Sequence, residues 1–236
     1  MSTALPIVFI PALLCDEAMF RDLIAELGPA HATRVTVARG RTVAESVAQI
    51  LDSSPERFVL VGASYGGIIA TEVALAAPDR IAGLCIAGAD PGAPDRAQSQ
   101  GFAAMVEGST DAAIEHLAKA VVRPEATAAA QTFREMARRV GGATGGAGIR
   151  ALGERTSAWE RLGELTMPAL VVWGAEDALF PVAVGRRLAA ALPHARLEVV
   201  EGSGHLPMLE APREAARVLG DWLRDAVLAP GEELAR

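Results

Sequence analysis

Residues 59–70 read VLVGASYGGIIA, and this stretch decides the fold of the chain. Its first residues form an apolar, β-branched run that predicts a buried strand, and the residues after Gly67 predict a helix. A strand and a helix so close in the chain are joined by a sharp, strained turn. Such a turn lifts Ser64 clear of the sheet and needs small neighbours, here Gly62 and Gly66. The pattern Gly-x-Ser-x-Gly in this setting predicts a nucleophile elbow.

Predicted strands and helices alternate on both sides of this stretch. Strands are expected at 4–11, 34–38, 57–61, 81–87, 169–173 and 195–200, and helices at 19–27, 43–51, 68–77, 182–192 and 212–227. Such alternation with short connections predicts an α/β fold, a mostly parallel sheet covered by helices on both faces.

The alternation stops after the strand that follows the elbow helix. Residues 91–164 contain no strand pattern, and helices are expected there at 111–122 and 126–140. We therefore predict an α/β core formed by residues 1–90 and 165–236, with a helical cap inserted at 91–164. The run GGATGGAG at 141–148 lacks phosphate-binding patterns and follows no strand, so we expect a flexible loop there and a mobile lid around it.

The composition of the chain excludes several classes of function. The chain has 236 residues, is 51% hydrophobic and carries a formal net charge of −7 with acidic and basic residues interspersed. This favours one α/β domain and predicts no nucleic-acid partner and no membrane span. Lys119 is the single lysine, so a phosphate loop of the Gly-Lys-Ser type is excluded.

The cysteines and histidines give no sign of a disulfide framework or a metal site. Cys15 and Cys85 are far apart in apolar surroundings, which favours reduced thiols and a cytoplasmic protein. The four histidines and two cysteines show no metal-ligand spacing. We therefore expect neither a metal nor another cofactor.

A serine nucleophile needs a base within hydrogen-bond reach. His205 lies in Gly202-Ser203-Gly204-His205, directly after the last predicted strand, where glycines permit a sharp turn. The ring would then point along the carboxyl edge of the sheet, where Ser64 also lies. The other histidines are expected to be ordinary surface or loop residues; they are His31, His116 and His194.

The acid that orients the base should leave a neighbouring strand at the same edge. Asp177 follows the predicted strand at 169–173 and is our choice. Glu176 beside it and Asp90, which ends the strand after the elbow helix, are the two alternatives.

An attacked carbonyl also needs two N–H donors for its developing oxyanion. The amide of Tyr65, next to the nucleophile, is one candidate, and the amide of Leu13, in the loop after the first strand, is the other. Apolar residues near these positions predict a pocket for a largely apolar substrate; they are Leu14, Leu179, Phe180, Leu206 and Met208.

The order Ser64, Asp177, His205, together with the elbow and the turns around it, resembles the α/β-hydrolase superfamily. Within it the chain is similar to small single-cap serine hydrolases of the carboxylesterase type. The resemblance implies an eight-stranded, mostly parallel sheet with a helical cap over the site. The sequence departs from the family pattern at 11–13, which read Pro-Ala-Leu where most members have His-Gly-x. It departs again at 38–42, where the usual Asp-x-x-Gly-His-Gly loop is reduced.

These residues predict hydrolysis of an ester, thioester or lactone of a small-molecule acyl substrate through an acyl-enzyme. C–C bond hydrolysis and cofactor-free perhydrolysis use the same triad and stay open, as does a receptor that only binds a ligand. A dehalogenase is disfavoured because its nucleophile is a carboxylate. A cyanohydrin lyase is disfavoured because Leu206 stands where plant lyases of this fold have lysine. The sequence does not indicate an oligomeric state.

Overall fold

A six-stranded sheet forms the centre of the computed structural model, which describes residues 5–108 and 111–227. The strands, in chain order, are β1 (Ile7–Ile10), β2 (Thr33–Val35), β3 (Phe58–Ala63), β4 (Ile81–Ala87), β5 (Ala169–Gly174) and β6 (Ala195–Val200). Their order across the sheet is β2-β1-β3-β4-β5-β6, and every neighbouring pair is parallel. The strand order reverses between β1 and β3, and ligands of open α/β sheets bind at the carboxyl ends of the strands flanking such a point.

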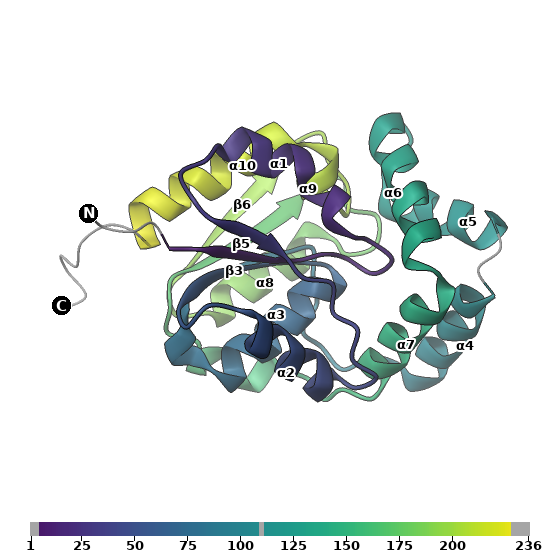
Figure 1. Cartoon of the computed structure of the whole chain (residues 1–236), viewed down its shortest axis with the longest axis horizontal. Helices are drawn as coiled ribbons and strands as arrows, with labels where there is room; N and C mark the ends of the chain where they lie inside the picture. The colour runs from purple at the N-terminus through teal and green to yellow at the C-terminus, as the bar shows by residue number, and fades with distance from the viewer. Residues whose placement is uncertain (1–4, 109–110, 228–236) are drawn as a thin grey trace.

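Helices cover both faces of the sheet (Figure 1). One face carries α1 (Arg21–Leu27) and α10 (Pro212–Trp222), and the other carries α2 (Val43–Ser53), α3 (Tyr65–Ala76) and α8 (Val182–Ala191). Side chains of a strand alternate between the two cores. In β1, Ile7 and Phe9 pack toward α1 and α10, while Val8 and Ile10 pack toward α2 and α3. This confirms the prediction of a parallel sheet buried on both faces.

In the described part of the chain, four helices lie between β4 and β5 in sequence and beside the sheet in space (Figure 1). They are α4 (Arg96–Glu107), α5 (Asp111–Val121), α6 (Thr127–Val140) and α7 (Gly142–Gly153), and a 3-10 turn, η3 (Trp159–Glu164), leads from them to β5. We call α4 to α7 the inserted helices. The helices expected at 111–122 and 126–140 are α5 and α6, whereas α4 was not predicted.

The glycine-rich run is not a loop, so that prediction is wrong. Residues 142–153 form helix α7, which packs against α4 and against the sheet's carboxyl edge. Glycine is needed at two of these positions because a side chain would not fit. A β-carbon on Gly145 would lie 2.5 Å from Leu14 Cδ2, and one on Gly146 would lie 2.2 Å from Glu107 Cγ. Close packing of the backbone therefore outweighs the poor helix propensity of glycine.

The implied strand count is also corrected. Residues 5–108 and 111–227 hold six strands, not the eight that the resemblance implied. These six correspond to the six apolar runs of the sequence, so the error came from the analogy and not from the residue pattern. The remaining short elements are η1 (Glu17–Met19), η2 (Pro78–Arg80), α9 (Pro207–Glu210) and the π turn η4 (Leu223–Val227).

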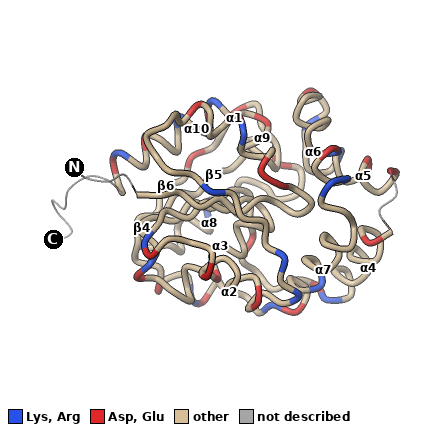
Figure 2. Tube along the Cα trace, in the orientation of Figure 1, with Lys and Arg blue, Asp and Glu red and all other residues tan. Residues whose placement is uncertain are grey.

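Basic and acidic residues are interspersed along the described part of the trace (Figure 2). Across residues 5–108 and 111–227, no helix combines the length and the apolar character that a membrane crossing requires. The same part of the chain contains no group of three or more His, Cys, Asp or Glu side chains placed to hold a metal ion.

Candidate active site

Ser64 sits on the turn between β3 and α3 with a backbone of φ 51° and ψ −116°. A positive φ is costly for a residue with a side chain, and such strain clusters at functional sites. Small neighbours make the turn possible. A β-carbon on Gly62 would lie 2.3 Å from the Gly66 carbonyl oxygen, and one on Gly66 would lie 2.1 Å from the Ile10 oxygen. The geometry is that of the elbow expected from residues 59–70.

The structure brings Ser64, His205 and Asp177 into one hydrogen-bonded row. His205 Nε2 lies 2.8 Å from Ser64 Oγ, and His205 Nδ1 lies 3.0 Å from Asp177 Oδ2. The side chains of His205 and Asp177 are 2% and 0% exposed. Because β3, β5 and β6 are parallel, the loops after them meet at one edge of the sheet and place the three groups together.

The Asp177 carboxylate is fixed by its own loop. Its Oδ1 accepts the Leu179 and Phe180 amides at 2.9 and 3.0 Å, which leaves Oδ2 directed at His205. The two alternatives for the acid point elsewhere. Glu176 Oε2 lies 3.1 Å from Arg123 Nε, and Asp90 Oδ1 accepts the Gly92 amide at 2.8 Å.

Two backbone amides beside Ser64 have no acceptor within the described residues. They belong to Leu13, in the loop after β1, and to Tyr65, the first residue of α3, where helix geometry leaves the N–H groups unpaired. In the same loop Leu14 has φ 60°, and it shares this positive φ only with Ser64 among the described non-glycine residues.

Asp16 links this loop to the inserted helices. Its carboxylate accepts the Ala18 amide at 3.0 Å and receives Arg139 Nε at 2.8 Å and Nη2 at 3.1 Å. Burial raises the pKa of the Asp16 carboxyl, but the hydrogen bonds from Arg139 and Ala18 outweigh it and hold that pKa below its ordinary value.

A cavity of about 240 Å³ opens at Ser64 and His205. Most of its wall is apolar, which suits an acyl group. Its lining residues are Leu13, Ser64, Tyr65, Ile68, Ala89, Ser99, Phe102, Ile149, Leu152, Arg155, Leu179, Phe180 and His205. Leu179 and Phe180 therefore lie where the sequence predicted, and the exposed Leu179 stands at the rim.

Three predicted pocket residues do not line this cavity. Leu14, Leu206 and Met208 are buried in the core, with 5%, 1% and 0% exposure. Leu14 turns toward α7, and Met208 lines a separate cavity beside α6. All three residues do lie near the loops that carry Leu13 and His205, as their positions in the sequence predicted. The geometry of these loops directs their side chains into the core.

The inserted helices supply cavity residues that the sequence did not reveal. Phe102 comes from α4, Ile149 and Leu152 come from α7, and Arg155 follows α7. Their apolar spacing is that of any amphipathic helix, so no signal separated them from core residues. Arg155 donates to the carbonyls of Leu152, Asp90 and Gly92, and burial lowers the pKa of its guanidinium.

Most of the chain is similar to known hydrolases. A family model described as the alpha/beta hydrolase family matches residues 7–218. A pimeloyl-[acyl-carrier protein] methyl ester esterase of Aromatoleum aromaticum is 31% identical over 80% of this chain and 83% of that protein. A 2-hydroxy-6-oxononadienedioate/2-hydroxy-6-oxononatrienedioate hydrolase of Burkholderia vietnamiensis is 29% identical over 80% of this chain and 70% of that protein.

Solved structures share the fold. A thermophilic esterase from Thermogutta terrifontis superposes with a TM-score of 0.84 at 22% identity, covering 95% of this chain and 91% of the esterase. The enol-lactonase of Burkholderia xenovorans superposes with a TM-score of 0.82 at 18% identity, covering 94% and 92% of the two chains. At these identities the likeness concerns the fold alone.

Proposed function

Because this chain belongs to the alpha/beta hydrolase family and is a hydrolase, we propose that it is a serine hydrolase cleaving small to medium, largely apolar esters, thioesters or lactones. One observation carries the proposal. Ser64 Oγ lies 2.8 Å from His205 Nε2, whose other nitrogen lies 3.0 Å from Asp177 Oδ2, at the wall of an apolar cavity. This is the arrangement that acyl transfer by serine requires.

In the proposed mechanism Ser64 Oγ attacks the acyl carbonyl while His205 Nε2 takes the serine proton. Asp177 accepts from His205 Nδ1–H, so it keeps Nε2 free to act as base and stabilises the imidazolium that forms. The amides of Leu13 and Tyr65 stabilise the oxyanion. His205 then protonates the leaving alcohol or thiol. Water, activated by the same ring, hydrolyses the acyl-enzyme. The mechanism uses no cofactor.

The inserted helices serve, in this proposal, as the cap at 91–164 over the core formed by 1–90 and 165–236. Phe102, Ile149 and Leu152 face the same cavity as Leu179 and Phe180 of the core, which supports a shared acyl pocket. The free, buried thiols of Cys15 and Cys85 support a cytoplasmic location.

A panel of p-nitrophenyl esters of increasing acyl length tests the proposal. We expect turnover of acetyl to hexanoyl esters, and loss of that turnover by several orders of magnitude in Ser64→Ala and His205→Ala. A fluorophosphonate should label Ser64 in the native chain and leave Ser64→Ala unlabelled. Ester turnover that survives in Ser64→Ala would refute the serine mechanism, and saturable ligand binding without any turnover would favour a receptor.

C–C bond hydrolysis is the second candidate. It is favoured by the relatives named as 2-hydroxy-6-oxononadienedioate hydrolases, which cover up to 80% of this chain. Adding a vinylogous 1,5-diketone acid to the panel separates the two reactions. A kcat/KM for the diketone that exceeds the best ester by tenfold or more would favour the C–C hydrolase. Peracid formation after addition of hydrogen peroxide would reveal perhydrolysis.

A further inference from the structure

Glu210, the last residue of α9, binds the backbone on both sides of His205. Its Oε1 accepts the Gly204 amide at 3.1 Å and the Leu206 amide at 3.2 Å. Its Oε2 accepts the Arg123 amide at 3.0 Å. The carboxylate therefore joins the loop that carries His205 to the segment between α5 and α6. The mechanism above does not use this carboxylate.

The Ser203 carbonyl accepts the Glu176 amide and the Ser203 hydroxyl donates to the Val200 carbonyl, but among the described residues Glu210 alone accepts from the Gly204 and Leu206 amides. Gly202 has φ 66°, and Gly204 has no side chain with which to pack. Asp177 and Ser64 each contact the His205 ring, but neither fixes the peptide groups beside it. Two hydrogen bonds from one carboxylate oxygen fix the peptide groups on both sides of the ring's own residue.

Arg123 connects the same point to the loop of the acid. Its amide donates to Glu210, and its Nε lies 3.1 Å from Oε2 of Glu176, the residue before Asp177. The Arg123 stem also covers Gly204, since a β-carbon there would lie 3.0 Å from Arg123 Cγ. One residue between two inserted helices therefore contacts the loops of both the base and the acid.

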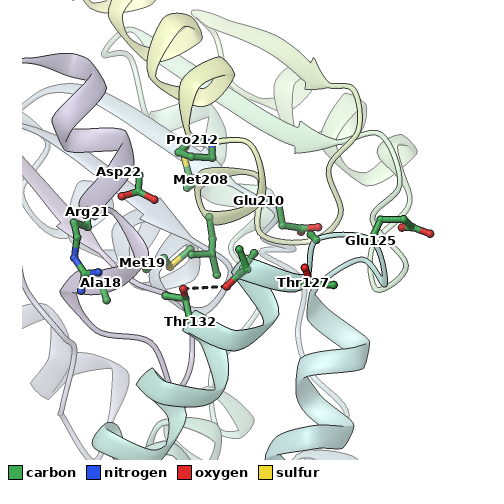
Figure 3. A pocket seen from close by; sticks show the side chains of 14 residues that line it. Ala18, Met19, Arg21, Asp22, Glu125, Thr127, Thr132, Met208, Glu210 and Pro212 are labelled. Carbon is green, nitrogen blue, oxygen red and sulfur yellow. Dashed lines mark hydrogen bonds between the residues drawn. The ribbon is translucent and has the colours of Figure 1, made fainter.

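A cavity borders Glu210 on one side. A cavity of about 310 Å³ lies between η1, the start of α6 and α9, and Glu210 is part of its wall (Figure 3). In Figure 3 Glu210 lies between Met208 of α9 and Thr127 of α6. Glu210 thus borders this cavity on one side, and three hydrogen bonds fix its carboxylate on the other.

We propose that Glu210 is a positioning residue for His205: its carboxylate holds the Gly204 and Leu206 amides, and through the Arg123 amide it ties the placement of the base to the seating of the inserted helices. The inference rests on the proposed role of His205 as base. Glu210 acts through the backbone, since its hydrogen bonds within the described residues go to amides and not to the ring of His205.

The test compares Glu210→Ala and Glu210→Gln with Glu214→Gln, which removes an exposed carboxylate of α10 paired with Arg217. Glu210→Ala loses all three acceptor contacts, and we expect kcat on p-nitrophenyl butyrate to fall up to about 10²-fold with KM changed less than about threefold. Glu210→Gln keeps one oxygen for the Gly204 and Leu206 amides, so most of kcat should return. Glu214→Gln should match the native chain.

A second readout follows the triad without any substrate. The proton between His205 Nδ1 and Asp177 gives a downfield proton resonance when the ring is held in place. We expect this resonance in the native chain and in Glu214→Gln, and we expect it to broaden or disappear in Glu210→Ala. If the native resonance is present but no ester is turned over, the proposed function fails while the positioning role is still measured.

Two outcomes overturn the inference. One is a folded Glu210→Ala that keeps both kcat within about twofold and the downfield resonance. The other is a Glu210→Gln as impaired as Glu210→Ala, because then the oxygen facing Gly204 and Leu206 is not what matters. Should Glu210→Ala fail to fold, Glu210→Asp replaces it. Its shorter carboxylate cannot reach both amides, and the same loss of kcat is expected.

Discussion

Asp177 is the residue whose substitution best separates the candidates for the acid. In Asp177→Asn one amide oxygen still accepts from the Leu179 and Phe180 amides, so the loop keeps its shape. The amide nitrogen then faces His205 Nδ1 and stabilises the wrong tautomer. We expect kcat for a p-nitrophenyl ester to fall by about 10⁴, as it does when this change is made in a serine-protease triad. The thermal midpoint should change little.

Two matched substitutions complete this measurement. Glu176→Gln removes an exposed carboxylate that pairs with Arg123, and we expect only a small change in kcat. Asp90→Asn alters a side chain that accepts the Gly92 amide, and it should also keep most activity. If Asp90→Asn abolished turnover while Asp177→Asn kept it, the acid would have been misassigned.

The meeting of Ser64, Asp177 and His205 could be predicted from the sequence, whereas the pocket wall could be predicted only in part, at Leu179 and Phe180. Ser64, Asp177 and His205 each follow a strand that its own apolar run reveals, so their meeting at one edge follows from a parallel sheet. Whether Leu206 or Met208 faces the cavity depends on how the loop after β6 turns its side chains, and the structure turns both into the core. No residue pattern encodes that orientation.

Helix α7 shows what a composition-based interpretation misses at the scale of an element. Five glycines in twelve residues suggest a loop by propensity alone. Their spacing carries the opposite signal. Glycines three or four residues apart at 142, 145, 146 and 148 place small residues along helix faces, and glycines of α7 pack on α4 and the elbow. Close approach of the backbones decided the structure.

Two glycine-to-alanine changes should have opposite effects on stability. A β-carbon on Gly145 would lie 2.5 Å from Leu14 Cδ2 and 2.9 Å from Val106 Cγ1, both of them buried. Overpacking of this kind should lower the free energy of unfolding by about 1–3 kcal/mol. Gly101 in α4 has open space around its missing β-carbon, so Gly101→Ala should raise it by up to about 1 kcal/mol. Urea denaturation measures both, and equal stabilisation by the two changes would contradict the packing role.

At the scale of the whole molecule, the segment that contains the inserted helices joins the core at the loops after β1, β4, β5 and β6. Arg139 binds Asp16 in the loop after β1, and Arg123 contacts the loops of the acid and the base. Arg155 donates to the carbonyls of Asp90 and Gly92, in the segment that follows β4. The sequence predicted a mobile lid from composition, but these long-range contacts could not be read from it, because each one pairs residues that are distant in the chain.

The Asp16 to Arg139 pair should make stability depend on acid pH. The folded-state pKa of Asp16 lies below its ordinary value, so its contribution is present above the unfolded pKa of about 3.9 and is lost as the pH falls through the folded value. The stability gap between the native chain and Asp16→Asn should therefore close below about pH 4. Asp111→Asn, which removes the exposed partner of Arg138, should show a small gap throughout. A gap for Asp16→Asn that does not vary between pH 7 and pH 3 would contradict this linkage.

The cavity at Ser64 is lined by both the core and the inserted helices, and amide hydrogen exchange can test how the two parts move. Strand β3 lies between two neighbours in the sheet and is buried along its length, whereas α7 packs on one side against α4 and the elbow. Amides of 142–153 should therefore exchange faster than those of β3, through openings that leave the core folded.

Phosphonylation of Ser64 by a hexyl phosphonate places an apolar chain against Phe102, Ile149 and Leu152. Because this apolar chain contacts the inserted helices when they cover the cavity, amide exchange in α4 and α7 should slow by tenfold or more, and amide exchange in β3 should stay the same. The Ser64→Ala chain, treated identically, is the control. Equal protection of α7 and β3 before labelling, or slowing confined to the core loops afterwards, would mean that the inserted helices do not close over the acyl group.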